Sequence, residues 1–334
     1  MAANVLDTVL LLALPASGKS EVRRYLDHPS DEESRASFHM GPTVQLDDYP
    51  YVHLMRRIDD ALEASGRARA FFAAADRGFA DTRDWGTLIE LVNEDYARLC
   101  AGERPAADDP AAWLFERIDR AREAVGAPPL RRALEGEARD RVAAEIADDA
   151  RQLINDLGAA TPETLDGRTV VIEFARGGPE DAKPPLPGGY GYGYSLAHLS
   201  AQILERAAIL YIWVTPEQSR AKNRARARPD ADGSILFHGV PEHVMRNDYG
   251  RDDMEWLLER SDRPGTVRVE AHGRVFHLPA ARFDNRTDLT SFLRGEPQDW
   301  PESAVAQLRE GLRAALDRIW QTGTGRRRDG TPKR

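Results

Sequence analysis

The chain has 334 residues, of which 46 are Lys or Arg and 55 are Asp or Glu, so its formal net charge is −9 at pH 7. This acidic balance argues against a general nucleic-acid-binding protein, which normally presents a net basic domain. No apolar run approaches the roughly 20 residues of a membrane span, and the one cysteine, Cys100, excludes an internal disulfide. We therefore expect a cytoplasmic protein without a membrane segment.

The first strong pattern along the chain is Ala13–Ser20, with the sequence Ala-Leu-Pro-Ala-Ser-Gly-Lys-Ser. It follows Val9–Leu12, which is typical of a buried parallel strand, and it precedes a predicted helix start at Glu21–Leu26. In this context a Gly-Lys-Ser loop binds phosphate groups, because backbone N–H groups and the helix dipole favour an anion. The residues predicted to hold a nucleotide triphosphate are Ala16, Ser17, Gly18, Lys19 and Ser20, with Lys19 on the β- and γ-phosphates and Ser20 on Mg²⁺.

Apolar runs that alternate with helical stretches predict an α/β fold with a parallel sheet. The predicted strands are Thr8–Leu14, Thr43–Leu46, Thr169–Phe174, Ala208–Val214 and a last one ending near Phe283. Before this last strand, two short runs flank Ala271-His272-Gly273 and predict a small β-hairpin over Thr266–Glu270 and Arg274–Leu278.

A long helical insertion separates the second and third predicted strands. Apolar residues at three- and four-residue spacing predict helices over Trp85–Leu99, Pro110–Val125 and Leu130–Leu157. We expect a core of residues 1–50 and 168–320, an insertion of residues 51–167, and a disordered basic tail of residues 321–334. The insertion either shields the sheet or serves as an acceptor-binding lobe, since pockets favour lobe junctions.

Two adjacent acids, Asp47 and Asp48, follow the second predicted strand. The carboxyl end of this strand lies beside the predicted phosphate-binding loop in a doubly wound sheet. An acid there can position or deprotonate an acceptor hydroxyl. We favour Asp47 for this role because it directly ends the strand, and we place Asp48 near the substrate; a solvated turn is the alternative.

The third predicted strand ends in Glu173-Phe174-Ala175-Arg176. A carboxylate at the end of an apolar strand is costly unless it is used, so Glu173 is a candidate to support Mg²⁺ or to act as the base. Arg176 is a candidate to bind an anionic substrate. The alternative is a local Glu–Arg surface pair.

An arginine-rich segment follows the fourth predicted strand, within residues 216–250. Its basic residues are Arg220, Lys222, Arg224, Arg226 and Arg228. Arg224 and Arg228 are four residues apart and share a helix face. We predict a mobile lid whose guanidinium groups, Arg224 and Arg228 in particular, stabilise the transferring phosphoryl group; a solvated basic helix face is the alternative.

Two further segments carry candidate ligand contacts. Asn285, in the turn after the last strand, is predicted either to contact the base or to cap a helix. The Gly/Tyr-rich stretch 188–194 precedes a helix expected near Ser195 and contains Tyr192. Its tyrosine rings can cover a ligand, or the stretch can be a flexible surface loop.

These residues together resemble the P-loop kinase superfamily, in its nucleoside and nucleotide kinase-like branch. The resemblance rests on Ala13–Ser20, Asp47-Asp48-Tyr49 (similar to the Asp-Asp-Phe-Tyr of uridine kinase-like enzymes), Glu173 with Arg176, the arginine-rich lid and the Asn285 turn. It implies a three-layer α/β/α P-loop NTPase fold with a five-stranded parallel sheet in the order 2-3-1-4-5. The insertion is longer than in small nucleotide kinases, which leaves the acceptor open.

The resemblance implies a phosphotransferase that uses ATP and Mg²⁺ and transfers the γ-phosphoryl group. The expected acceptor is a small molecule with a hydroxyl or phosphate group, for example a nucleoside or nucleotide. One alternative is a nucleotide-dependent switch that hydrolyses slowly and acts through the insertion. Another is a kinase for nucleic acid, against which the net charge argues. The sequence leaves open the oligomeric state, the preference for ATP or GTP, and the choice of base among Asp47, Asp48 and Glu173.

Overall fold

The protein is described here by a computed structural model that covers residues 5–226 and 239–328. It is an α/β protein with one mostly parallel sheet of six strands in the order β2-β3-β1-β4-β6-β5. The strands are β1 (Thr8–Leu12), β2 (Thr43–Asp47), β3 (Thr169–Phe174), β4 (Ala207–Trp213), β5 (Thr266–Ala271) and β6 (Arg274–Asp284).

The sheet has one strand more than the five expected, because the hairpin and the last strand share β6. From Arg274 to Pro279, β6 pairs antiparallel with β5, and from Ala280 to Asp284 it pairs parallel with β4. The predicted hairpin is therefore confirmed, and it is continuous with the sheet. Its turn contains His272 and Gly273 with φ values of 51° and 67°, the left-handed conformation that two-residue hairpin turns require.

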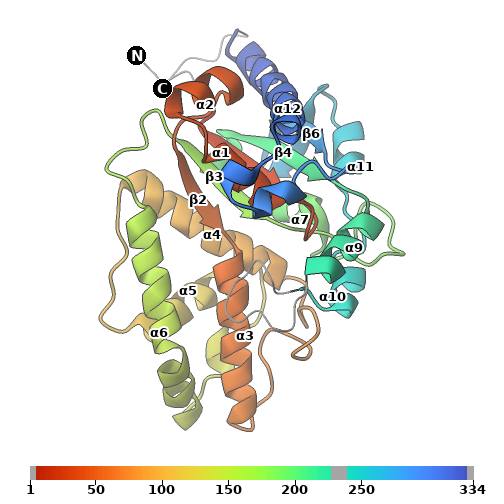
Figure 1. Ribbon diagram of the computed structural model, residues 1–334. Helices are drawn as coiled ribbons and strands as arrows, with labels where there is room; N and C mark the ends of the chain where they lie inside the picture. The colour runs from red at the N-terminus through yellow and green to blue at the C-terminus, as the bar shows by residue number, and fades with distance from the viewer. Residues whose placement is uncertain (1–4, 227–238, 329–334) are drawn as a thin grey trace.

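The sheet is covered by helices on both faces (Figure 1). The helices of the core are α1 (Lys19–Leu26), α2 (Asp31–Phe38), α7 (Gly191–His198), α8 (Ala201–Leu204), α9 (Pro216–Arg226), α10 (Glu242–Asn247), α11 (Met254–Glu259) and α12 (Glu302–Arg328), with short 3₁₀ turns at Ser291–Arg294 and Pro297–Asp299. Residues of α1 and α12 pack on one face of the sheet in a common apolar cluster. Residues of α4, α7 and α8 pack on the other.

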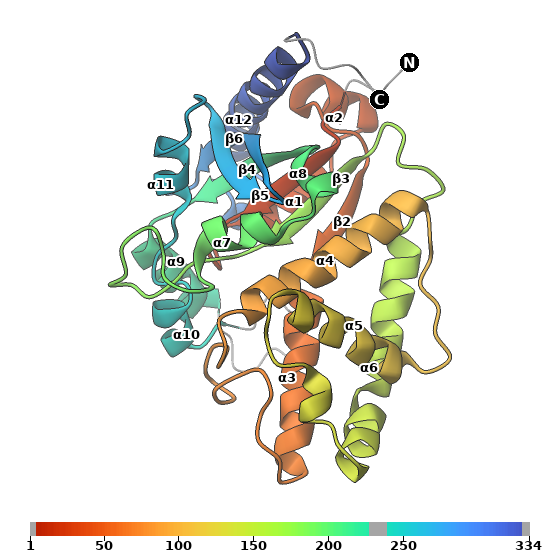
Figure 2. The ribbon, with the colours of Figure 1, turned by 180° about the vertical axis from the view of Figure 1, so that it is seen from behind.

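The insertion forms a helical lobe beside the sheet. It consists of α3 (Tyr49–Ala64), α4 (Asp84–Ala101), α5 (Pro110–Ala124), a 3₁₀ turn at Leu130–Arg132 and α6 (Glu137–Ala160). The predicted helix from Leu130 is interrupted, because Gly136 adopts a φ of 60° and α6 begins only after it. Seen from behind, α4 runs between the sheet and the other lobe helices (Figure 2).

Helix α4 belongs to two apolar cores. Ile89 and Val92 pack in the cluster of the sheet, whereas Leu88 and Leu91 pack in the cluster of the lobe. The hydroxyl groups of Tyr96 and Thr8 also lie 2.8 Å apart, which joins α4 to β1. The apolar clusters of the sheet and of the lobe are therefore joined through α4.

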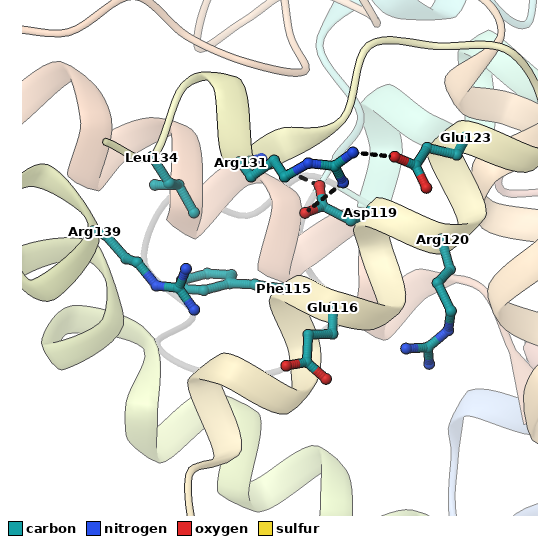
Figure 3. A pocket seen from close by; sticks show the side chains of 8 residues that line it. All are labelled: Phe115, Glu116, Asp119, Arg120, Glu123, Arg131, Leu134 and Arg139. Carbon is teal, nitrogen blue, oxygen red and sulfur yellow. Dashed lines mark hydrogen bonds and ion pairs between the residues drawn. The ribbon is translucent and has the colours of Figure 1, made fainter. Parts of the chain in front are cut away.

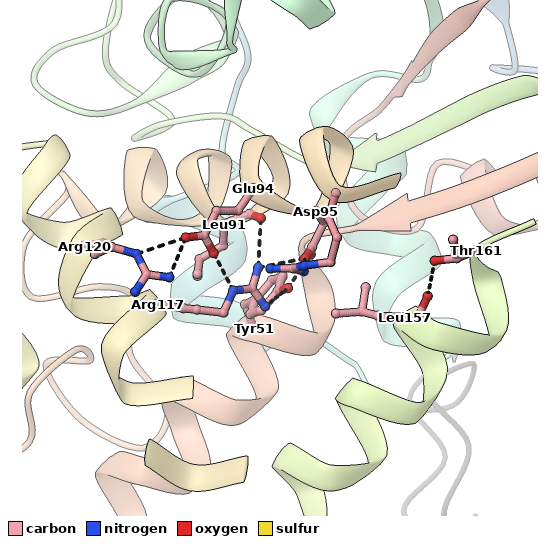
Figure 4. A network of polar contacts seen from close by, with 9 residues as sticks. Tyr51, Leu91, Glu94, Asp95, Arg117, Arg120, Leu157 and Thr161 are labelled. Carbon is pink, nitrogen blue, oxygen red and sulfur yellow. Dashed lines mark hydrogen bonds and ion pairs between the residues drawn. The ribbon is translucent and has the colours of Figure 1, made fainter. Parts of the chain in front are cut away.

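A buried polar network fixes the lobe helices to one another (Figure 4). Arg117 of α5 donates to Glu94 at 2.5 Å and to Asp95 at 2.7 Å, both on α4, and to the Tyr51 hydroxyl of α3 at 2.9 Å. Tyr51 in turn donates to Asp95. Because Arg117 is buried, these bonds satisfy a charge that would otherwise be costly, and they fix the start of α3, which follows Asp47 and Asp48.

The C-terminal helix is longer than expected. α12 continues to Arg328, beyond the predicted start of a disordered tail at residue 321. Residues 329–334 of that predicted tail lie outside the described residues. No helix in the described part of the chain has the length and apolar character needed to cross a membrane.

Candidate functional site

The Ala13–Ser20 loop connects β1 to α1 at the carboxyl end of the sheet. Ala16 and Gly18 have φ values of 56° and 100°, so the loop turns sharply before α1 begins at Lys19. A Cβ on Gly18 would lie 2.4 Å from Thr290 Oγ1 and 2.6 Å from Asn285 Nδ2, which excludes any larger residue without rearrangement. The first N–H groups of α1 have no partner within the helix and can bind an anion.

Asn285 supports this loop from behind. Its amide nitrogen donates to the Ser17 carbonyl at 2.7 Å and to Thr290 Oγ1 at 2.8 Å, and its oxygen accepts from the Leu289 N–H. Since the residue is fully buried and both amide hydrogens are used, it has nothing left to contact a base. In this conformation Asn285 supports the loop and caps no helix, and its predicted cofactor contact stays a prediction.

Lys19 and Glu173 form an ion pair at the same end of the sheet. Lys19 Nζ lies 3.4 Å from Oε2 of Glu173, and Arg23 Nη1 lies 3.1 Å from Oε1. Glu173 is buried and both of its oxygens face cations, which stabilises its negative charge. The arrangement positions the Lys19 ammonium next to the loop.

Asp47 and Asp48 have different environments despite being neighbours. Asp47 is in register with Glu173 across β2 and β3, is half-buried, and accepts the Tyr49 N–H at 2.9 Å. Asp48 is buried, and its Oδ2 accepts a 2.6 Å hydrogen bond from Arg176. Burial raises the pKa of Asp48, while Arg176 and Lys19 oppose the rise.

Arg176 is a structural residue in this arrangement. It is 1% exposed and donates to Ser195 Oγ at 2.8 Å, to Asp48, and to the carbonyl of Ala175 at 2.7 Å. Its guanidinium also lies 4.8 Å from the ring centre of Trp85. In this conformation Arg176 holds Asp48 and does not line the cavity, and its predicted contact with substrate stays a prediction.

Tyr192 also lies in the core rather than over a ligand. It is fully buried within α7, between Phe174 and Tyr211. The helix begins at Gly191, earlier than expected, because Asp253 accepts the N–H groups of Tyr192 and Gly193 at 2.6 and 3.0 Å. The ring of Tyr192 therefore packs in the core in this conformation, and its predicted ligand contact stays a prediction.

The predicted lid is described only in part. Its helix α9 is anchored at its start, where Ser219 Oγ donates to the Pro15 carbonyl at 2.7 Å and Lys222 pairs with Asp288 at 3.0 Å. Arg224 is 59% exposed and pairs with Glu242 of α10 at 3.3 Å, outside the cavity described next. Arg228 lies outside the described residues.

One cavity of about 450 Å³ joins the loop to the lobe. On the core side it is lined by Ala16, Gly18, Lys19, Ser20, Asp47, Asp48 and Glu173. On the lobe side it is lined by Arg56, Phe72, Phe79 and Trp85, and a segment after α9 adds Val240, Pro241, Val244, Asp248 and Tyr249. It thus brings most of the predicted site residues together with aromatic ones, and its size suits a small molecule.

Sequence reasoning missed the aromatic lining and Asp248. The segment between α3 and α4 interrupts the helical pattern and yet contains Phe71, Phe72 and Phe79, an apolar loop that could have indicated a pocket wall. Asp248 is buried and accepts from the Tyr190 hydroxyl at 3.2 Å. Burial raises its pKa to about 6, while Tyr190 and Arg56 oppose the rise.

A second cavity lies within the lobe, between α5 and the segment that leads to α6 (Figure 3). Three of its charged side chains are paired with one another, since Arg131 contacts Asp119 at 3.3 Å and also Glu123. It contains none of the residues singled out above. Among the described residues, no group of three or more His, Cys, Asp or Glu side chains could hold a metal ion by itself.

Sequence comparisons with family models and curated proteins assign the chain to no family. No protein-family model matches it, and no curated protein matches it significantly. Function is therefore inferred from the site itself.

Proposed function

We propose that the protein is an ATP- and Mg²⁺-dependent phosphotransferase that acts on a small acceptor, with nucleosides and nucleotides among the candidates. The observation that carries the proposal is the cavity that joins the Ala13–Ser20 loop and Asp47 to an aromatic wall. A triphosphate at the loop and an acceptor at the wall would then meet beside Asp47. Such positioning accounts for much of the catalysis in phosphoryl transfer.

The loop residues fit a triphosphate. Ala16 and Gly18 have positive φ values, so the loop turns sharply before α1. Ser17 Oγ is buried without a hydrogen-bond partner among the described residues. When a triphosphate binds, the Lys19 ammonium would leave the Glu173 carboxylate and contact phosphate oxygens, because both are anionic partners for the same ammonium. Magnesium, which neutralises phosphate charge when bound, would be held by Ser20 with Glu173 or Asp47. This small set of side chains is sufficient because Mg²⁺ usually binds only one or two protein carboxylates.

Asp47 is the residue best placed to orient or deprotonate the acceptor hydroxyl. It lines the cavity, lies in register with Glu173 and is half-buried, whereas Asp48 is bonded to Arg176. Arg224 pairs with Glu242 in this conformation, so its proposed contact with the phosphoryl group requires that this exposed pair opens.

The test is ³¹P NMR of the purified protein with Mg·ATP, with and without pools of nucleosides, nucleotides, sugars and amino acids. A new phosphomonoester or phosphoanhydride signal that depends on one pool is expected, together with its loss in Lys19→Ala but not in Lys183→Ala, an exposed lysine. ADP and inorganic phosphate at a rate that no pool alters would contradict the proposal and favour a nucleotide switch.

A further inference from the structure

The lobe side of the cavity is built from four aromatic rings in mutual contact, Phe72, Phe79, Trp85 and Tyr249, which we call the aromatic end. The Phe72 and Phe79 rings stack at 4.6 Å, Phe79 and Trp85 meet edge to face at 4.8 Å, and Trp85 and Tyr249 do so at 5.6 Å. Val240 and Val244 add aliphatic surface. Such walls favour a flat, apolar-faced group.

Two polar side chains of this region are buried without satisfying their hydrogen-bonding capacity. Asp248 and Trp85 are 3% and 5% exposed and both line the cavity. Within the described residues, neither Oδ2 of Asp248 nor the indole N–H of Trp85 has a hydrogen-bond partner. Buried polar atoms of this kind are rare and call for an explanation. One is an acceptor and the other a donor, so a single ligand with the complementary pair would satisfy both.

The surroundings of Asp248 disfavour a charged ligand group. A phosphate would be repelled by the carboxylate once it is ionised. A protonated amine would compete with Arg56, whose guanidinium already acts on Asp248. Arg56 is held in place by the carbonyls of Ala75 and Arg77 at 2.9 and 3.1 Å, and it lies 3.9 Å from the Phe72 ring centre. A neutral N–H donor avoids both conflicts.

We propose that the aromatic end binds a neutral planar ring with an N–H group beside a carbonyl, that is, a lactam or imide. The N–H group donates to Oδ2 of Asp248, and the carbonyl accepts from the indole N–H of Trp85. This proposal rests on the proposed function only in naming the class of acceptor; the binding itself can be measured without any phosphoryl transfer.

The test follows the indole N–H signals of the ¹⁵N-labelled protein by NMR during titration with uridine and inosine. The Trp85 signal is assigned as the one missing in Trp85→Phe. The matched probes are 3-methyluridine for uridine and 1-methylinosine for inosine, because in each pair a methyl group replaces the hydrogen of the ring N–H group. Either parent probe is expected to shift the Trp85 signal, and its methylated partner to bind at least about tenfold more weakly.

The Asp248→Asn variant should reduce this discrimination, because an amide is a weaker acceptor than a carboxylate. The exposed control Asp181→Asn should keep it. No shift with either parent probe, or equal binding of the methylated probes, would overturn the inference. Phosphorylation of an acceptor without any effect on the Trp85 signal would overturn it and leave the proposed function intact. Conversely, discriminating binding without transfer would contradict only the proposed function.

Discussion

Lys19 Nζ lies 3.4 Å from Oε2 of Glu173, although the whole helical lobe separates the two residues in sequence. Arg23 contacts the other oxygen of the same carboxylate. The pairing of β1 with β3 places Glu173 opposite Leu11, just ahead of the loop. The carboxylate thereby holds the lysine at the loop before any phosphate is present, which is the kind of preorganisation that electrostatic catalysis needs.

We therefore expect Glu173→Gln to lower the rate of phosphoryl transfer by about tenfold or more, because the Lys19 ammonium loses its charged partner. The variant also leaves Arg23 beside Lys19 without a counter-charge. Steady-state kinetics with Mg·ATP measures the effect, and Glu163→Gln, on the exposed surface, is the control. An unchanged rate in Glu173→Gln would show that the ion pair does not prepare the lysine.

Asn285→Ala should weaken the binding of ATP and GTP by the same factor. The side chain holds the loop through Ser17 and is too deeply buried to reach a base. Loss of its buried hydrogen bonds should also lower the free energy of unfolding by about 2–3 kcal/mol. Titration calorimetry with both nucleotides and urea denaturation provide the measurements. A changed ratio of ATP to GTP affinity would restore the base-reading role.

Gly18→Ala should be far more harmful than the same substitution at another left-handed glycine. At Gly18 the new methyl group meets Thr290 and Asn285, whereas at Gly66, with φ of 72°, nothing lies within 4 Å. Gly66→Ala should cost about 1 kcal/mol of stability, and Gly18→Ala about 2 kcal/mol more, with loss of ATP binding. Thermal denaturation of both variants tests this, and equal losses would contradict the packing seen here.

Stability should fall as the pH rises from about 5 to about 7.5. Burial, as the main cause, raises the pKa of Asp252 to about 6 from its ordinary value of 3.8, and the nearby acids Asp253 and Glu255 add to the rise. The folded state therefore keeps a proton that the unfolded state has lost, which favours folding only at the lower pH. The whole shift corresponds to about 3 kcal/mol, of which roughly 1.4 kcal/mol is lost between pH 5 and pH 7.5, since the unfolded state has already lost most of its proton at pH 5.

The Asp252→Asn variant should remove this part of the decline, because the amide does not ionise and still accepts from Tyr211, whose hydroxyl donates to Asp252 at 2.7 Å. Urea denaturation at pH 5, 6 and 7.5 measures the slope. The variant Asp181→Asn, at an exposed position, should decline like the original protein. A wild-type stability that rises over this range would refute the assignment.

The sequence predicted those parts of the site that depend on short segments of the chain. Gly18-Lys19-Ser20 between a strand and a helix predicts the shape of the loop, and strand ends predict that Asp47 and Glu173 meet at one edge. It did not show that Arg176, Asn285 and Tyr192 are buried. Arg and Asn are usually exposed and Tyr is intermediate, so only packing between distant segments shows their burial.

The lining of the cavity could not be predicted for the same reason. Trp85 begins a helix of the lobe, while Asp248 and Tyr249 follow α10 in the core. The helical pattern that begins at Trp85 indicates a buried face but not a cavity wall, and only the folded chain brings the three residues to one wall. The aromatic loop before α4 was the one local indication.

The position of α4 between the sheet and the lobe has a consequence for the history of the chain. β2 and β3 are parallel neighbours, so the segment between them is the crossover connection that any such pair requires. The lobe is thus an enlarged crossover, with α4 covering the sheet as an ordinary crossover helix would. Joining the ends of β2 and β3 directly would remove that cover, so evolution could lengthen or reshape this segment but could not discard it.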